Sequence, residues 1–300
     1  MKRQWKGRTR GGPFGYLFFI WLVRTAGLGA AYAFLGLVVV YFIVAAPSQT
    51  RSVWVYSRRI LRYGHLRSAG FLFRSYYAFG QSIIDKVVAG MGMADRFTYV
   101  FDGRDVIMEM VRSRKGCVVI GAHTGSWQMG ASFFGKAGAR VNVVMLDNEY
   151  RSVKDIVSRN VCQPDFKVIP LDDSDFSFLI SITSALRDGE LVCFQGDRYI
   201  NEDRVMRTEF LGYQAEFPEG PFHLAASLGC PAVFYFAMRE KGRRYRFIFR
   251  TPEMISPRND GEKMNDYIFR TYISALEEVV REYPGQWFNY YDFWKLYSDK

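Results

Sequence analysis

His123 is the side chain in this sequence best suited to moving a proton near neutral pH, because an imidazole titrates there. It follows the apolar run 117–120, which predicts a buried strand whose carboxyl end would present the histidine to a substrate. Such a group takes a proton from an attacking hydroxyl or amine when a neighbouring acceptor holds the ring in one tautomer. Five residues on, where a carboxylate would usually be that acceptor, the chain has Gln128. A lone histidine after a strand is often only structural, so the catalytic interpretation depends on other segments.

Two later segments also carry polar or charged residues next to predicted strands or helices. The run Phe-Gln-Gly-Asp-Arg at 194–198 ends a second apolar stretch, and Phe-Pro-Glu-Gly-Pro at 217–221 begins a helix-like segment. Together with His-Thr-Gly-Ser-Trp-Gln at 123–128 and a Pro-containing strand at 229–233, they resemble the glycerolipid and lysophospholipid acyltransferase superfamily in residue type and order. They look most like its bacterial lipid A late acyltransferase branch, and the resemblance covers roughly residues 70–295.

The resemblance implies an α/β fold, a mixed sheet flanked by helices, with an N-terminal membrane-attached helical segment. It implies acyl transfer from a thioester of acyl carrier protein or coenzyme A to a hydroxyl of a lipid or glycolipid acceptor such as a lipid A precursor. No cofactor beyond the thioester is expected, and acyl carrier protein would suit a basic face electrostatically. The catalytic residues would be His123 and Gln128, and the substrate-binding residues Gly125, Trp127, Asp197, Arg198, Glu219 and Gly220.

Two of these side chains also have a structural interpretation. Arg198 follows a predicted buried strand, where its planar guanidinium suits a phosphate, but most arginines are solvated surface charges. Glu219 lies in a turn into a helix, which it would cap unless, as the resemblance implies, it lies near the acceptor head group.

Gln128 departs from the His-x4-acid pattern of the family. Its carbonyl can still fix the tautomer of His123, but an amide carries no charge to stabilise the imidazolium that forms in the transition state. Three outcomes stay open: a slower enzyme, a site in which Glu219 or Asp197 supplies the charge, or a lipid-binding membrane protein without activity. The last belongs to a different functional class from the first two.

The sequence also leaves the identity of the acyl acceptor open. The beginning of the chain, at 5–12, and the aromatic run at 286–294 look like the acyltransferases found with aryl polyene or flexirubin-type pigment synthesis, and an aminolipid is a further alternative acceptor. The aromatic run is otherwise typical of a tail that closes a core, although Trp and Tyr also favour the membrane interface.

Charge is distributed unevenly along the 300 residues. The net charge is +10, and residues 1–84 contain twelve Lys or Arg but no acidic residue before Asp85. A basic flank of this kind binds either nucleic acid or an anionic membrane surface. The uncharged run 25–50 within it favours the membrane, so we expect no nucleic-acid partner.

The run 25–50 is long enough to cross a bilayer, which needs about 20 apolar residues. A second apolar stretch at 13–23, ended by Arg24, makes a re-entrant or interfacial helical pair the competing geometry. We expect residues 1–50 to form a basic segment and anchor and residues 51–300 to form the acyltransferase domain. The continuing arginine series to Arg74 favours the cytoplasmic face of a bacterial inner membrane, although basic residues flank the run on both sides.

The four cysteines form no Cys-x-x-Cys pair and indicate reduced core residues, typical of a cytosolic face. His65 and His223 stand in segments that predict helices, and no metal site is expected.

The body of the chain alternates predicted helices and strands, as an α/β sheet requires. Helices are predicted at 68–88, 104–114, 126–137, 152–160, 175–188, 220–228 and 262–282, and strands at 117–122, 141–146, 167–169, 191–195, 232–238 and 245–250. Asp147 joins His123, Asp197 and Arg198 at predicted strand ends, and the stretch 201–216 is expected to be a loop that could contact substrate.

Overall fold

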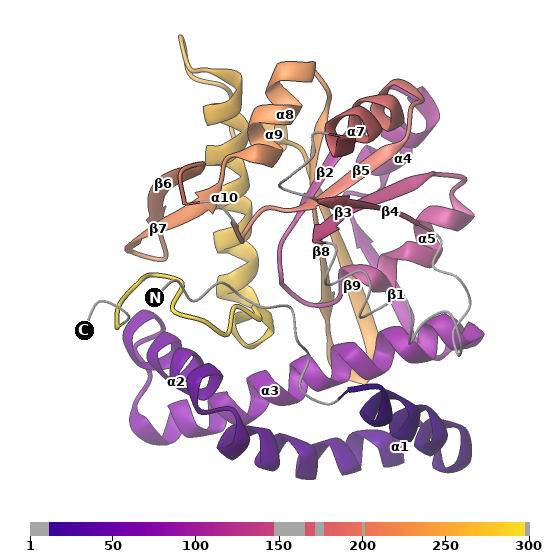
Figure 1. Ribbon diagram of the computed structural model, residues 1–300, viewed down its shortest axis with the longest axis vertical. Helices are drawn as coiled ribbons and strands as arrows, with labels where there is room; N and C mark the ends of the chain where they lie inside the picture. Colours follow the sequence, from indigo (N-terminus) through magenta and orange to yellow (C-terminus); the bar gives the residue numbers. More distant parts are fainter. Residues whose placement is uncertain (1–11, 147–165, 172–176, 200–201, 298–300) are drawn as a thin grey trace.

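The computed structural model describes residues 12–146, 166–171, 177–199 and 202–297, and a seven-stranded sheet forms its centre (Figure 1). The strands lie in the order β1-β9-β8-β2-β5-β3-β4. Their bounds are β1 Thr98–Asp102, β2 Cys117–Gly121, β3 Val141–Leu146, β4 Lys167–Leu171, β5 Leu191–Gln195, β8 Ala232–Arg239 and β9 Arg244–Arg250. All neighbours are parallel except β8 and β9, so the expected α/β fold with a mixed sheet is confirmed.

Helices cover both faces of this sheet (Figure 1). They are α4 Arg104–Ser113, α5 Ala131–Lys136, α7 Ser177–Arg187, α8 Gly220–Leu228, α9 Pro252–Ile255 and α10 Met264–Glu282. Helices α8 and α10 pack on each other and against β2 and β8, whereas α4, α5 and α7 contact β9, β3 and the β4–β5 pair. Because both faces are covered, β2 is buried along its whole length, which explains its unbroken apolar sequence.

Most of the predicted elements are present within a few residues of their predicted bounds. The helix predicted at 126–137 is wrong in part, because a 3₁₀ turn, Trp127–Gly130, comes before the short α5. The helix predicted at 152–160 and Asp147 lie outside the described residues. Strand β1 was not predicted from the sequence, although its Thr-Tyr-Val-Phe composition favours a strand.

The loop expected at 201–216 is wrong, because most of this stretch forms a β-hairpin. Strands β6 (Val205–Phe210) and β7 (Tyr213–Pro218) pair antiparallel, with Phe210 opposite Tyr213. The two residues between them, Leu211 and Gly212, both have positive φ, which matches the twist of a tight hairpin. The signal in the sequence was the Leu-Gly pair, which is weaker than the Asn-Gly pair usually found there.

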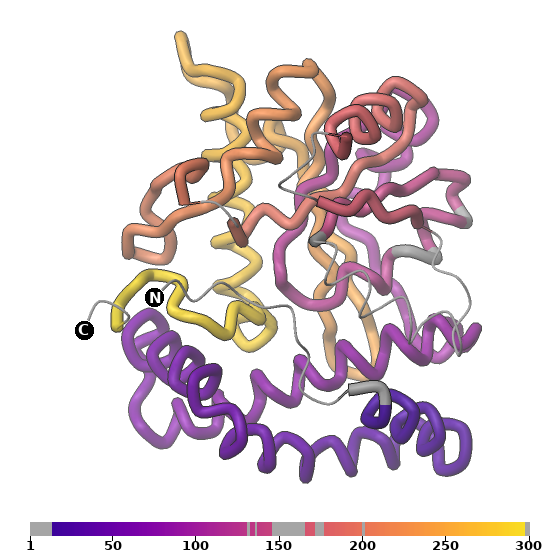
Figure 2. The backbone as a smooth tube through the Cα atoms, viewed as in Figure 1, coloured from indigo at the N-terminus to yellow at the C-terminus, as the bar shows by residue number. Residues whose placement is uncertain are grey.

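Three N-terminal helices lie beneath the sheet (Figure 2). They are α1 Gly12–Ala45, α2 Pro47–Val55 and α3 His65–Val88, with a π-helical turn, Tyr56–Ile60, before α3. Helix α1 is long and apolar enough to cross a membrane by length and composition, but its backbone is not helical at Gly27 (φ 83°, ψ 171°). The predicted boundary at residue 50 falls inside α2. The shorter turns are Ala89–Met93, Ala94–Arg96, Lys241–Arg243 and Pro284–Gln286.

A buried carboxylate joins this helical layer to the sheet. Asp85 of α3 is fully buried and accepts hydrogen bonds from Arg239 Nε (2.8 Å) and Tyr245 Oη (2.6 Å) on the sheet, and from Tyr32 of α1. Gln286 exchanges two hydrogen bonds with the backbone of Arg239, 2.7 and 2.9 Å long. We call Asp85, Arg239, Tyr32 and Tyr245 the Asp85 cluster.

We expect Asp85→Asn to lower the free energy of unfolding by about 3–5 kcal/mol, because it leaves the guanidinium of Arg239 buried without its counter-ion. The measurement is denaturant unfolding in mild detergent. Asp102→Asn is the matched control: the side chain of Asp102 is 43% exposed where it pairs with Arg250, so its loss should change stability by about 1 kcal/mol or less. Equal losses in the two variants would contradict a special role for the Asp85 cluster.

Candidate active site

The pairing of β2 with β5 brings His123 to Asp197. The strands are parallel neighbours in register from Cys117 opposite Leu191 to Gly121 opposite Gln195. His123 lies two residues beyond the end of β2 and Asp197 two residues beyond the end of β5, so the two side chains arrive at the same level. His123 Nδ1 lies 2.7 Å from Asp197 Oδ1, and the backbone N–H of His123 donates to the same carboxylate at 3.0–3.1 Å.

Asp197 is fully buried and is surrounded by donors. In addition to the two N–H groups of His123, Trp287 Nε1 donates to Oδ2 at 3.1 Å and Asn289 Nδ2 donates at 2.9 Å. Four donors thus share two carboxylate oxygens, which satisfies the charge without water. An asparagine at position 197 would place its NH₂ group, which is itself a donor, against some of these donors.

The charge of Asp197 sets the electrostatics of the site. Burial alone would raise its pKa, but the neighbouring His123, the hydrogen bonds from it and the charge of Arg198 outweigh burial and hold the pKa at about 2. The carboxylate is therefore ionised at neutral pH and fixes the proton of the imidazole on Nδ1. The side chain of His123 is 26% exposed, so Nε2 is the nitrogen left to meet a substrate.

The carboxyl-terminal tail holds the loop that carries His123. Phe288 N donates to His123 O and Gly125 N donates to Gln286 O, both at 2.8 Å, and Thr124 forms an antiparallel bridge with Trp287. The tail, like an added short strand, fixes the backbone on both sides of the histidine. Trp287 and Asn289 are site residues that the sequence did not single out, beyond the observation that the tail is rich in aromatic residues.

Arg198 contacts this tail. Its Nε donates to Asn289 Oδ1 at 2.7 Å, a guanidinium NH₂ donates to Phe288 O at 2.9 Å, and its Cζ lies 5.9 Å from the centre of the Tyr291 ring. Asn289 therefore joins Arg198 to Asp197 through its two amide atoms. In this structure Arg198 orders the surroundings of the carboxylate; its predicted contact with an anionic acceptor stays a prediction.

Gln128 does not hold His123. Among the described residues no hydrogen bond joins the two side chains, because the chain turns at Gly125 and enters the 3₁₀ turn that contains Gln128. Gly125 has φ +55°, and a Cβ at this position would lie 2.0 Å from Ala237 O. Only glycine permits this turn, and its N–H is already bonded to the tail. Of the acids considered from the sequence, Asp197 is the one in contact with the imidazole.

Glu219 and Gly220 are not part of this constellation in the contacts between described residues. Glu219 is the N-cap residue of α8 by position, but its side chain makes no capping hydrogen bond. Gly220 is exposed. Their predicted role near an acceptor head group stays a prediction.

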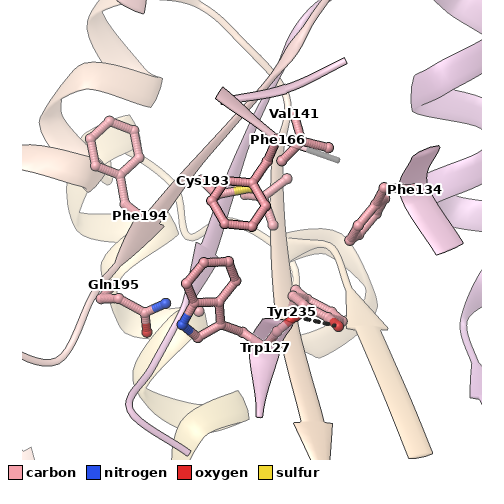
Figure 3. Close-up of a pocket in the computed structure, with 10 residues that line it drawn as sticks. Trp127, Phe134, Val141, Phe166, Cys193, Phe194, Gln195 and Tyr235 are labelled. Atoms are coloured by element: carbon pink, nitrogen blue, oxygen red, sulfur yellow. Dashed lines mark hydrogen bonds between the residues drawn. The ribbon is translucent and has the colours of Figure 1, made fainter. Parts of the chain in front are cut away.

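An apolar pocket is formed by residues of neighbouring strands of the sheet together with the side chains of Trp127, Phe134 and Phe166 (Figure 3). The ring of Trp127 packs against Phe166 in a tilted arrangement, with ring centres 5.5 Å apart, and the Trp127 carbonyl accepts a hydrogen bond from Tyr235 Oη at 3.3 Å. Gln195 Oε1 is buried at the wall, and none of the described residues donates a hydrogen bond to it. The pocket is lined by Val119, Gly121, Trp127, Phe134, Val141, Phe166, Cys193, Phe194, Gln195 and Tyr235. In the part of the chain that the structure describes, no cluster of three or more His, Cys, Asp or Glu side chains could hold a metal ion.

Residues 78–296 match the family model of the bacterial lipid A biosynthesis acyltransferases. The match covers β1 to β9, both strand ends that carry His123 and Asp197, and the tail that surrounds them. The chain therefore belongs to this family of acyltransferases. A comparison with curated proteins found no match.

We expect Asp197 to add stability that depends on pH. Its folded pKa of about 2 is below the value of about 3.9 for an unfolded aspartate, so its contribution is present above about pH 4 and is lost as pH falls toward 2. The free energies of unfolding of the parent and Asp197→Asn should therefore differ most at pH 5–7 and converge as pH falls. Both proteins share every other acid, so a difference that is constant with pH would contradict this assignment.

Proposed function

We propose that this protein transfers a fatty acyl chain from a thioester of acyl carrier protein or coenzyme A to a hydroxyl of a lipid A-like acceptor. Family membership supports the reaction class and the lipid acceptor. The observation that carries the proposal is the 2.7 Å contact between His123 Nδ1 and the buried Asp197, which leaves Nε2 as a base. A general base of this kind contributes roughly 100- to 10,000-fold to a rate.

In the proposed reaction, His123 Nε2 takes the proton of the acceptor hydroxyl while the oxygen of that hydroxyl attacks the carbonyl carbon of the thioester. The resulting imidazolium is stabilised by the charge of Asp197, as in other histidine–aspartate pairs. The tetrahedral intermediate then collapses, the new ester forms, the carbon–sulfur bond breaks, and the imidazolium returns its proton to the thiolate. No covalent enzyme intermediate is required.

The geometry weakens the alternative of a lipid-binding protein without activity. That alternative rests on the absence of an acid at position 128, whereas a charged partner is present at position 197 and is fully ionised. A pigment precursor or an aminolipid as the acceptor would use the same dyad and differs only in the head group. Lipids extracted from cells with and without the gene will identify the acceptor, because the acylated product is missing from one sample.

The apolar pocket is the proposed site of the acyl chain. Gly121 lies two residues from His123, and Gln195 lies two residues from Asp197, so the pocket is adjacent to the dyad. Its walls are almost entirely aromatic and aliphatic, which suits an acyl chain, but the open space between them is about 20 Å³, so these side chains must move apart for a chain to enter. A chain held here would have its carbonyl near the imidazole.

The membrane is the proposed location. An acceptor and a product that are both lipids, together with the apolar α1 and the basic N-terminal region, support attachment to the inner membrane with the catalytic domain on the cytoplasmic face. The positive charge of this region would also attract an acidic surface of acyl carrier protein, the first of the two donors named above.

We expect the dyad variants to separate His123 and Asp197 from Gln128. His123→Ala and Asp197→Asn should each lower acyl transfer by roughly 100- to 10,000-fold, because one removes the base and the other removes the charge that fixes and stabilises it. Gln128→Glu should leave the rate within about twofold or lower it, since Nδ1 already donates to Asp197. Transfer is measured with purified protein and the identified acceptor.

A rate increase in Gln128→Glu would show that position 128 supplies the missing charge. Unchanged transfer in His123→Ala would exclude the mechanism altogether. Far-UV circular dichroism confirms that each variant is folded.

The pocket assignment predicts a change in acyl-chain preference. Cys193→Phe places a ring against the walls formed by Trp127 and Phe166, so transfer from long-chain donors should fall at least tenfold more than transfer from short-chain donors. Cys230→Phe is the matched control, because Cys230 is not among the residues that line the pocket. An equal loss for all chain lengths in Cys193→Phe would contradict the assignment.

A further inference from the structure

Helix α1 consists of two helical segments that fold against each other. The backbone breaks at Gly27, and the ring of Phe18 before the break lies 4.9 Å from the ring of Phe34 after it. Phe19 also contacts Phe34, with centres 6.1 Å apart. A continuous helix would place positions 18 and 34 about 24 Å apart along its axis, so these contacts define a helical pair.

The second segment of the pair has two apolar stripes on opposite sides. Leu28, Ala31, Leu35 and Val39 are buried and recur at helical spacing. Phe34, Leu37, Tyr41 and Val44 recur at the same spacing on the other side and are exposed, Leu37 by 69% and Val44 by 78%. Only 22% of the most apolar part of the helix is buried, so much of its apolar surface has no protein neighbour among the described residues.

The buried stripe packs along α3, so the second segment runs beside this helix beneath the sheet (Figure 1). Close to the start of this segment, the hydroxyl of Tyr32 donates a hydrogen bond to Asp85, which also pairs with Arg239 at the end of β8. A segment that crossed the bilayer with this packing would place Asp85 and Arg239 beside the hydrocarbon core and bring the end of the sheet with them. Burying that part of the domain in lipid is strongly unfavourable.

Length gives a second constraint. The segment before Gly27 is about 22 Å long at 1.5 Å per residue, which is shorter than the bilayer core of about 30 Å. The segment after it is about 27 Å long, which nearly suffices, so its side contacts and not its length prevent a crossing.

The charges around the pair match an anionic lipid surface. Residues 1–84 contain twelve basic side chains and no acid, and the first acid, Asp85, is buried and paired. Arg24 is exposed next to the break, and Arg51 and Arg74 are exposed on α2 and α3. Attraction near such a surface is worth about 1 kcal/mol per basic residue.

We propose that residues 12–45 form an in-plane helical pair that inserts its exposed apolar stripe into one leaflet of an anionic membrane and does not cross it. The inference rests on the membrane location in the proposed function. It makes the catalytic domain monotopic and holds the α3 layer against the lipid surface, and it places both ends of the pair on the side of the catalytic domain.

Topology provides the first test. The full chain carries a protease-cleavable epitope tag at each terminus and is expressed in bacteria, and sealed inverted membrane vesicles are treated with the protease. We expect both tags to be cleaved without detergent. Cleavage of the carboxyl-terminal tag alone, with the N-terminal tag cut only after detergent is added, would show that α1 crosses the membrane and would overturn the proposal.

Surface binding provides the second test. Leu37→Glu/Val44→Glu should lower co-sedimentation with vesicles of phosphatidylglycerol and phosphatidylethanolamine by at least tenfold, because both changes lie on the exposed stripe. Ile180→Glu is the matched control, since Ile180 is 74% exposed on α7 and outside the helical pair. Equal binding of the double variant and the control would overturn the proposal, and thermal unfolding in detergent confirms that both are folded.

The two tests are independent of catalysis. If both tags are cleaved and His123→Ala has unchanged transfer, the proposed reaction fails and the membrane arrangement stands. If transfer depends on His123 but the N-terminal tag is protected, the arrangement fails and the reaction stands.

Discussion

The buried carboxylate of Asp197 is the interaction on which the site depends. A charge with no exposure to solvent is stable only if donors surround it, and here they come from two distant parts of the chain: His123 after the end of β2, and Trp287 and Asn289 of the carboxyl-terminal tail. Each donor is also held in place by the carboxylate. The orientation of His123, the path of the tail and the end of the β2–β5 pair are therefore parts of one arrangement.

This arrangement explains how the chain retains a dyad without an acid five residues after the histidine. The acid is supplied by the neighbouring strand, because β2 and β5 are parallel and in register to their ends. The amide of Gln128 is therefore not needed to fix the tautomer of the His123 imidazole. The turn at Gly125 directs residue 128 away from the imidazole. This turn requires glycine, because a Cβ at position 125 would collide with Ala237 O.

A second buried carboxylate, Asp85, connects the sheet to the N-terminal helices. The helices α1 and α3, the end of β8 and Gln286 meet around it, and Gln286 continues into the tail that holds the loop of His123. Aromatic contacts extend the same connection, because Phe79 of α3 packs on Phe288 of the tail with ring centres 5.1 Å apart. The helical layer and the site are thus joined by buried polar and aromatic contacts and not by a flexible linker.

The sequence by itself determined the α/β class, most helices and strands, His123 at the end of a buried strand and the basic, apolar N-terminal region. These follow from local periodicity and composition, which are properties of neighbouring residues. It left open whether Gln128, Asp197 or Glu219 serves the imidazole, and whether residues 25–50 span a membrane or pair with the preceding segment. The tertiary structure decided that Asp197 contacts His123 and that Phe18 packs on Phe34. Strand register joins the first pair across 74 residues of sequence, and helix packing joins the second pair across 16 residues, so no local pattern can specify either contact. The hairpin β6–β7 and the roles of Trp287 and Asn289 came from the same source, since each exists only through contacts made after the chain has folded.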